Sequence, residues 1–364
     1  MTIAEVKILG AGSIGNHMAH AARRLGWAVT LCDVDPAALQ RTEREIYPSR
    51  YKSWDPAIRL SKPEEAPRGE AELIVIGTPP DTHIALARQA VAERPRAILI
   101  EKPLCTPSLE GLTELAEEAA SSGVRLFVGY DHVIGAAAEK AAALLTEGVI
   151  GPVLTIDVEF REEWSGVFAA HPWLDGPADS YLGYWERGGG STGEHSHALN
   201  LWQFLARVCD AGATKHVSAT MTMVNQGRVA YDALSAMTLT SHNGLTGRVV
   251  QDVMTKPARK WARVQGRNGA VEWVCGAEPG LDVARLELDG GERQEFRFSK
   301  TRPDDFIREL QHIDQAVATG AESPIDAVRG FETMLAIAAA YRSHAEGRVV
   351  SIEANKGWSS AALS

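Results

Sequence analysis

Three glycines near the N-terminus have the spacing of a loop that holds the diphosphate of a dinucleotide. Gly10-Ala11-Gly12-Ser13-Ile14-Gly15 fits G-x-G-x-x-G and lies between an apolar run and an alanine-rich segment. In such a loop the first glycine permits a tight turn, the second lets the backbone approach the phosphates, and the third lets the helix pack on the strand. Free N–H groups at the start of the helix face the anion. We predict that Gly10, Gly12, Ser13, Ile14 and Gly15 bind a dinucleotide.

Asp33 follows Gly15 by 18 positions, at the end of a second apolar run. A carboxylate at this point can accept hydrogen bonds from the ribose hydroxyls of adenosine. It would repel a 2′-phosphate, and the next basic residue, Arg41, stands eight positions further on. The sequence therefore favours NAD over NADP. The alternative is an ordinary glycine turn followed by an unrelated loop aspartate.

The elements that would position these residues alternate between two periodicities. Apolar strand candidates are separated by helical segments of about 10–15 residues, a pattern typical of βαβ units and of a parallel sheet covered on both faces. The candidate strands are 6–9, 28–32, 73–76, 97–100 and 125–128, and the helices are 14–25, 81–92 and 108–121.

The pattern changes near residue 130. Strand candidates at 153–160, 216–224, 234–240 and 246–253 are followed by helices at 304–318 and 325–344. Turn sequences such as Arg267-Asn268-Gly269 indicate hairpins and thus an antiparallel sheet, with one face available to substrate or to another subunit. We predict an α/β chain with a nucleotide-binding domain over 1–130 and a substrate-binding and oligomerisation domain over 131–364.

Composition limits the classes of partner. The chain has 364 residues, a net charge of −10, and four cysteines without C-x-x-C spacing. The charge disfavours nucleic acid and anionic membranes, and no apolar run reaches the roughly 18 residues that a membrane crossing needs. Structural zinc and a disulfide framework are unlikely for cysteines so far apart. The first residues lead straight into a strand-like run, so we expect a soluble, cytoplasmic protein.

Three further segments carry a family resemblance. Thr78-Pro79-Pro80-Asp81-Thr82-His83 follows the third predicted strand, Glu101-Lys102-Pro103 follows the next, and Gly188-Gly189-Gly190 precedes a histidine-bearing segment. Together with the glycine loop, these motifs resemble the Gfo/Idh/MocA oxidoreductases over nearly the whole chain. The resemblance implies a Rossmann domain, a second α/β domain with a large, mostly antiparallel sheet, and nicotinamide-dependent chemistry on a sugar, sugar derivative or cyclitol. It also implies a homodimer or homotetramer formed through that sheet.

The resemblance assigns roles to several of these residues. Lys102 matches a family lysine that lies beside the nicotinamide, where its ammonium could hydrogen-bond the reacting oxygen or exchange a proton with it. Thr78, Pro79, His83 and Glu101 are expected at the nicotinamide side of the cleft. For His83, a role in packing or capping the following helix is as plausible.

The second catalytic segment departs from the family pattern of an aspartate followed four residues later by a histidine. Here Gly193-Glu194-His195-Ser196-His197 offers no ungapped register that satisfies both positions. Spaced i, i+3, Glu194 and His197 would share a face of a helix. We predict His197 as the proton shuttle, because an unperturbed imidazole pKa of about 6.5 suits neutral pH. Glu194 would orient it or bind a substrate hydroxyl.

Other residues are candidates for substrate contact. Aromatic faces pack on the C–H faces of sugars, and acids accept hydrogen bonds from hydroxyl groups, although tryptophans are more often simple packing residues. The candidates besides Lys102, Glu194 and His197 are Asp131, Glu163, Trp164, Trp173 and Trp185. A metal held by Glu194, His195 and His197 is disfavoured, because no third well-spaced ligand is evident and hydride transfer to nicotinamide needs none. We expect no metal.

The leading hypothesis is an NAD(P)-dependent dehydrogenase or reductase acting on CH–OH groups. One alternative is an enzyme that retains NAD and acts as a lyase, glycosidase or isomerase through transient oxidation of a sugar. The other is a catalytically silent NAD-binding regulatory protein, which the altered histidine segment keeps open.

Overall fold

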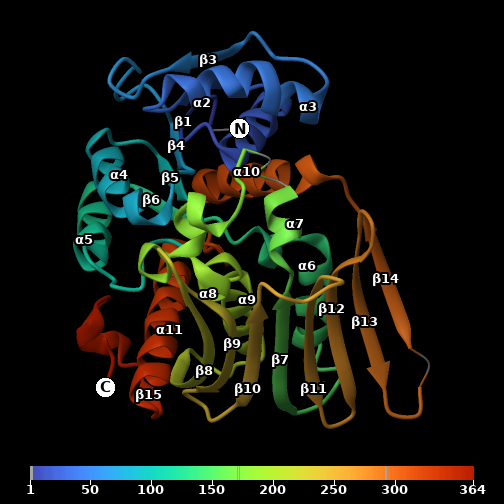
Figure 1. Cartoon of the computed structure of the whole chain (residues 1–364). Coiled ribbons are helices and arrows are strands. Elements are labelled where there is room, and N and C mark those ends of the chain that lie inside the picture. Colours follow the sequence, from blue (N-terminus) through green and yellow to red (C-terminus); the bar gives the residue numbers. More distant parts are fainter. Residues whose placement is uncertain (1–2, 170, 172, 292) are drawn as a thin grey trace.

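Two sheets organise the chain in the computed structural model (Figure 1), which describes residues 3–169, 171, 173–291 and 293–364. The first sheet is parallel and has the order β3-β2-β1-β4-β5-β6. This is the strand order of the doubly wound dinucleotide-binding fold, so the predicted Rossmann domain is confirmed. Its strands are β1 (Glu5–Leu9), β2 (Ala28–Cys32), β3 (Ile58–Ser61), β4 (Leu73–Ile76), β5 (Ala97–Ile100) and β6 (Arg125–Val128).

Helices cover this sheet and connect its strands. The first of them begins at Ser13, within the glycine motif and one residue before the predicted start. A π-helical turn, η1 (Thr42–Ile46), joins two short helices in the stretch that the sequence left without assignment. The helices are α1 (Ser13–Arg24), α2 (Pro36–Arg41), α3 (Tyr47–Tyr51), α4 (Pro80–Ala92) and α5 (Leu112–Ser122).

The second sheet has nine strands in the order β14-β13-β12-β11-β7-β10-β9-β8-β15. Neighbouring strands are antiparallel except β10 and β7, which are parallel, so the predicted mostly antiparallel sheet is confirmed. The strands are β7 (Val153–Arg161), β8 (Thr214–Gln226), β9 (Val229–Ser241), β10 (Thr246–Asp252), β11 (Arg259–Gly266), β12 (Gly269–Glu278), β13 (Leu281–Leu288), β14 (Gln294–Ser299) and β15 (Val350–Ser351).

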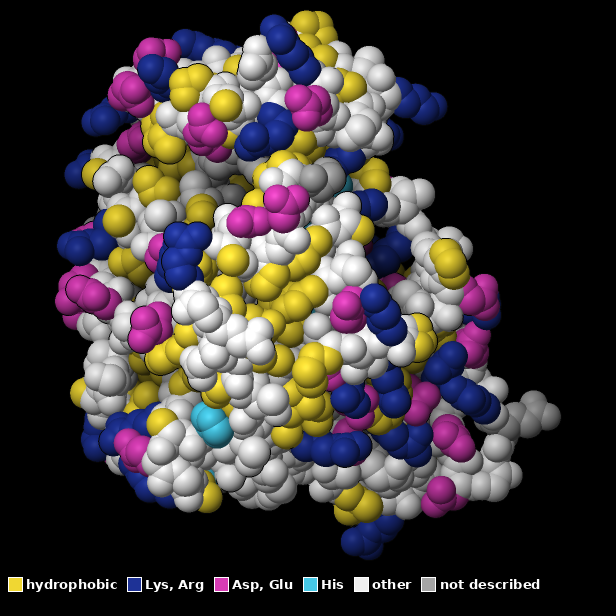
Figure 2. Space-filling view, viewed as in Figure 1, with side chains coloured by type: hydrophobic (Ala, Val, Ile, Leu, Met, Phe, Trp, Pro, Cys, Tyr) yellow, Lys and Arg dark blue, Asp and Glu magenta, His cyan; other side chains and the backbone are white. Residues whose placement is uncertain are grey.

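Helices α6 (Ala136–Thr146), α9 (His197–Val208) and α11 (Ala327–Glu346) pack on one face of the second sheet. The other face carries charged side chains that pair across the strands, as in the Arg248–Asp157 and Arg263–Glu272 ion pairs, together with uncharged ones such as Thr238 and Trp261. Figure 2 shows Lys and Arg side chains gathered with Asp and Glu over the strands at lower right. Among the described helices, none combines the length and apolar character that crossing a membrane requires.

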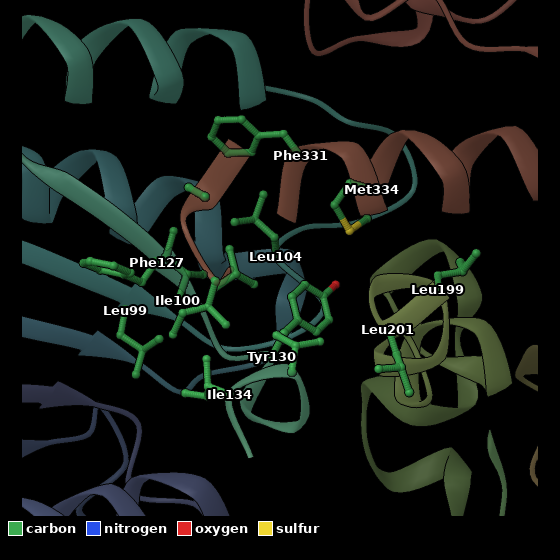
Figure 3. Close-up of a cluster of buried hydrophobic side chains, with 14 of the residues drawn as sticks. Leu99, Ile100, Leu104, Phe127, Tyr130, Ile134, Leu199, Leu201, Phe331 and Met334 are labelled. Carbon is green, nitrogen blue, oxygen red and sulfur yellow. The ribbon is translucent and has the colours of Figure 1, made fainter. Parts of the chain in front are cut away.

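The two sheets share a core. Phe331 and Met334 of α11 lie beside Leu104 and Tyr130, which follow strands of the first sheet (Figure 3). Helix α10 (Arg302–Thr319) packs against α1, and the Val128 N–H donates to the Ile325 carbonyl oxygen at 2.9 Å. The C-terminal helices thus pack back on the nucleotide-binding sheet and fix the strand ends that carry the site.

Candidate active site

The glycine loop has the shape that a dinucleotide diphosphate requires. Gly10 has φ +105°, and a Cβ there would lie 2.7 Å from the Gly77 carbonyl oxygen. A Cβ on Gly15 would lie 1.9 Å from the Gly10 carbonyl oxygen, whereas one on Gly12 would meet nothing within 4 Å. The first and third glycines therefore permit close packing, and the second leaves open space beside the uncapped N-terminus of α1. That space and the helix N–H groups fit a pyrophosphate.

Asp33 is anchored beside this loop. Its Oδ2 accepts a hydrogen bond from the Ala11 N–H at 2.8 Å, and its Oδ1 accepts one from the Asp35 N–H at 2.9 Å. The side chain is half-buried at the end of β2. These bonds hold the carboxylate at the mouth of the loop, where an adenosine ribose bound to the fold would lie.

One cavity of about 650 Å³ joins the glycine loop to the predicted catalytic residues. It runs between the strand ends of the first sheet and the inner part of the second domain. Of the residues predicted from the sequence, its lining includes Gly12, Ser13, Ile14, Thr78, Pro79, Glu101, Lys102, Asp131, Trp173, Glu194 and His197.

Lys102 and Glu194 meet inside this cavity. Lys102 Nζ donates to the backbone carbonyl oxygen of Glu194 at 2.8 Å and to Glu194 Oε2 at 3.3 Å. Burial alone would raise the pKa of the Glu194 carboxyl, but Lys102 and neighbouring histidines outweigh it and lower that pKa. Glu194 is therefore an ionised carboxylate at neutral pH and holds the lysine ammonium in place.

The helix expected through Glu194 and His197 is interrupted, which corrects the sequence prediction. Helix α8 (Gly190–Glu194) ends at Glu194, and α9 begins at His197. The buried Asp232 carboxylate accepts hydrogen bonds from Ser191 Oγ and the Thr192 N–H, and so anchors α8 separately from α9. Both side chains still line the cavity, but the break between the helices brings them there, rather than a shared helical face.

His197 lies in a group with Asp131 and His132. Asp131 Oδ1 is 3.8 Å from His197 Nδ1 and 3.9 Å from His132 Nδ1. Burial, followed by the charge of neighbouring groups, lowers the pKa of His197 well below 6.5. The premise of an unperturbed imidazole is therefore wrong, and His197 is neutral at physiological pH. Within the described part of the chain, these three residues are the set that could hold a metal ion. The expectation of a metal-free site stays a prediction.

Several carboxyl groups that line the cavity have raised pKa values, and two of them, Glu101 and Glu309, are buried. Burial, with Asp131 nearby, raises the pKa of Glu101 from 4.5 to about 7, although Lys102 opposes the shift. Burial also raises the pKa of Glu309 well above its ordinary value and that of Asp305 to about 6. Glu101 and Glu309 thus keep their protons to a higher pH than ordinary carboxyls do, whereas Asp305 also pairs with Lys300 at 3.0 Å.

His83 positions two loops rather than lining the cavity. Its side chain is fully buried, with Nε2 2.8 Å from the Thr78 carbonyl oxygen and Nδ1 3.1 Å from the Pro103 carbonyl oxygen. A neutral imidazole donates to one carbonyl at a time. Through these contacts, His83 ties the Thr78-Pro79 turn to the loop that carries Lys102.

Three predicted substrate residues lie outside the cavity lining. Glu163 pairs with Lys256 at 2.7 Å, Trp164 packs against Phe168, and Trp185 packs on the Tyr341 ring. Glu162, the neighbour of Glu163, lines the cavity in its place, and of the predicted tryptophans Trp173 lines it.

Other residues that line the cavity were not predicted from the sequence. They are spread along the chain from residue 132 to residue 309, with several in α10, and lie in segments that lack a local motif. For most of them the sequence signal is a polar or charged side chain within or directly beside an apolar element, whereas Phe306 and Cys275 carry no such signal. They include His132, Glu162, Tyr181, Lys260, Cys275, Asp282, Lys300, Arg302, Asp305, Phe306 and Glu309; His195, which the sequence suggested only as a weak candidate, lines the cavity as well.

Comparison with solved structures shows the same fold in several oxidoreductases. A levoglucosan dehydrogenase in complex with NADH and L-sorbose is 17% identical, with a TM-score of 0.77 and coverage of 96% of this chain and 99% of that one. An Agrobacterium radiobacter oxidoreductase in complex with NAD+, L-tartaric acid and magnesium is 20% identical, with a TM-score of 0.74 and coverage of 96% and 98%. A putative myo-inositol dehydrogenase from Sinorhizobium meliloti 1021 is 21% identical, with a TM-score of 0.72 and coverage of 96% and 99%. Comparison with curated proteins finds no match.

Two family models match most of the chain. Residues 4–130 match the oxidoreductase family with an NAD-binding Rossmann fold, and residues 142–352 match the C-terminal α/β domain of that family. The chain therefore belongs to the Gfo/Idh/MocA oxidoreductase family.

Proposed function

We propose that this protein is an NAD-dependent dehydrogenase or reductase that interconverts a hydroxyl and a carbonyl group on a sugar, sugar derivative or cyclitol. The observation that carries the proposal is the Lys102–Glu194 contact in the same cavity as Gly12 and Ser13. Bound nicotinamide would supply the hydride acceptor or donor. Asp33 favours NAD over NADP because its carboxylate repels a 2′-phosphate.

Lys102 would hold the reacting oxygen. An ammonium has three N–H donors, and two contacts of Lys102 are directed at Glu194. The third donor can reach a substrate oxygen and stabilise the negative charge that develops on it during hydride transfer. Glu194 keeps the lysine oriented, because its carboxylate and carbonyl oxygens both accept from Lys102 Nζ.

His197 would accept the hydroxyl proton. A neutral imidazole has a nitrogen able to take a proton, and Asp131, 3.8 Å from Nδ1, would stabilise the imidazolium, whose formation the lowered pKa of His197 makes costly. In the reverse direction the same imidazolium returns the proton to the alkoxide. Asp131, Trp173 and Glu194 would contact the substrate hydroxyls and ring.

We also propose that the two domains have different roles. Residues 1–130 would hold the cofactor, and residues 131–364 would shape the substrate site and join subunits. The uncovered face of the second sheet, with its cross-strand ion pairs, would form the homodimer or homotetramer interface. Light scattering in solution measures the number of subunits, and a monomer at working concentrations would contradict this assembly.

A substrate panel tests the reaction. The purified protein is incubated with NAD, and separately with NADP, and with individual sugars, sugar derivatives and cyclitols while NADH absorbance is followed. The proposal predicts net NADH formation with at least one substrate class. Product without net NADH would instead identify an enzyme that retains its cofactor. Binding of NAD with no product across the panel would favour a silent regulatory protein.

A further inference from the structure

A second cavity, of about 390 Å³, adjoins the main one and contains an unusual charge arrangement. Its charged lining consists of Arg50 and Arg302, with His17 beside them, and none of the described residues that line it is acidic. Such a cluster stands out in a chain with a net charge of −10. Arg302 and Trp173 line both cavities, so the second is a side branch of the cofactor and substrate cleft.

Arg302 is the first residue of α10 and comes from the second domain. Its guanidinium lies over the Phe306 ring, 5.1 Å from the ring centre, and its side chain is exposed. Within the described chain it forms no salt bridge, whereas Arg308 on the same helix pairs with Glu139. The Phe306 ring leaves the five N–H donors of Arg302 available to an anion.

Arg50 reaches the same place from the first domain. Its guanidinium donates to the Ser13 carbonyl oxygen at 2.9 Å and to Ser13 Oγ at 2.8 Å. Ser13 begins α1 and lines the main cavity beside Gly12. Arg50 therefore contacts the first residue of the helix whose N–H groups fit a diphosphate.

The charges of the two guanidinium groups act on the same neighbouring side chain, His17. Burial, and then the charges of Arg50 and Arg302, lower the pKa of His17 to about 3. Burial also lowers the pKa of Arg50, and Arg302 adds to that effect. Like charges near one another in a partly buried place are unfavourable unless an anion binds between them.

We propose that Arg302 binds the pyrophosphate of the dinucleotide, together with Arg50, which hydrogen-bonds Ser13. A residue of the second domain would then contact a cofactor that is bound to the first domain. The inference rests on the proposed cofactor. A pyrophosphate is the anion that the glycine loop and Ser13 would place at the junction of the two cavities, and a guanidinium matches the geometry of phosphate oxygens. Arg302 would act as a cofactor-binding residue that keeps the domains closed over NAD.

Calorimetric titration of Arg302→Ala with NAD and ADP, and competition with adenosine, test the assignment. Loss of a charge-assisted phosphate contact should weaken NAD and ADP about ten- to hundredfold. Adenosine, which has no phosphate, should bind the variant and the wild type equally. Arg302→Lys keeps the charge but not the paired donors, and should lose less affinity than Arg302→Ala. Circular dichroism confirms that each variant is folded.

Arg308→Ala is the matched control, because Arg308 lies on the same helix, pairs with Glu139 and lines neither cavity. It should bind both nucleotides like the wild type. Unchanged ADP affinity in Arg302→Ala, or an equal loss for adenosine, would overturn the assignment. So would Arg302-dependent binding of inorganic phosphate to protein already saturated with NAD. If the wild type binds neither NAD nor ADP, the proposed function fails instead.

Discussion

Lys102 Nζ lies 2.8 Å from the backbone carbonyl oxygen of Glu194, although the two residues are 92 positions apart. Lys102 follows a strand of the parallel sheet, and Glu194 ends a short helix that Asp232 anchors to the second domain. This contact joins the two domains at the point where hydride chemistry would occur. A second contact, from Lys102 Nζ to Glu194 Oε2 at 3.3 Å, holds the two side chains together in the absence of substrate.

Lys102→Ala should reduce turnover by about two to four orders of magnitude, because the developing negative charge on the substrate oxygen loses its donor. The fold should survive, because the Lys102 side chain lines the cavity and is not part of the hydrophobic core. Steady-state kinetics and circular dichroism measure both outcomes. Lys215→Ala, at an exposed position of β8, is the matched control and should behave as wild type. Turnover of Lys102→Ala within tenfold of wild type would refute the role of Lys102.

Asp33→Ala should weaken NAD binding and relax discrimination against NADP. The substitution removes the acceptor for the ribose hydroxyls and the charge that repels a 2′-phosphate. Asp33→Asn keeps the size and one acceptor oxygen while removing the charge, so it separates the two effects. Dissociation constants for both cofactors are the measurement. If neither constant changes in Asp33→Ala, Asp33 does not select the cofactor.

Glu101→Gln should flatten the dependence of stability on pH between about 4.5 and 7. Burial raises the pKa of Glu101 from 4.5 to about 7 in the fold. Over that window the folded state keeps a proton that the unfolded chain has lost, so this group's contribution to stability falls as pH rises. Denaturant unfolding at pH 5 and pH 8 compares the two proteins. An identical pH dependence in wild type and variant would show that Glu101 titrates normally.

The purified protein should turn over without a stoichiometric metal ion, because in the proposed reaction Lys102 stabilises the charge on the oxygen and His197 takes the proton. Elemental analysis after dialysis should find well under one equivalent, and a chelator should leave turnover unchanged. Asp131, His132 and His197 are the residues to examine if this fails, since their ligand atoms lie within 4.8 Å of one another. One tightly bound equivalent whose removal abolishes turnover would contradict the expectation.

Much of the first domain could be predicted because its strands are continuous apolar runs. The predicted strands 28–32, 73–76, 97–100 and 125–128 have the observed bounds. In contrast, β3 (Ile58–Ser61) was not predicted, since this four-residue edge strand alternates with the exposed Arg59 and sits in a polar stretch. Local hydrophobic pattern identifies buried central strands better than short edges.

The substrate side of the cavity was less predictable because it depends on contacts between distant segments. Lys260 lies on β11, which pairs with β7, and its Nζ pairs with Glu162 at 3.0 Å. Nothing local to Lys260 indicates that strand order. Likewise, the i, i+3 spacing of Glu194 and His197 suggested one helix, but α8 ends at Glu194, anchored by the distant Asp232, and α9 begins at His197.

Isotope transfer tests the central claim most directly. A substrate found in the panel is prepared with deuterium on the carbon to be oxidised and mixed with the protein and NAD. Direct hydride transfer predicts that the deuterium appears in the NADH formed, one equivalent per product. Deuterium released to water, or retained in the product without NADH, would contradict the assignment of this protein as an NAD-dependent dehydrogenase.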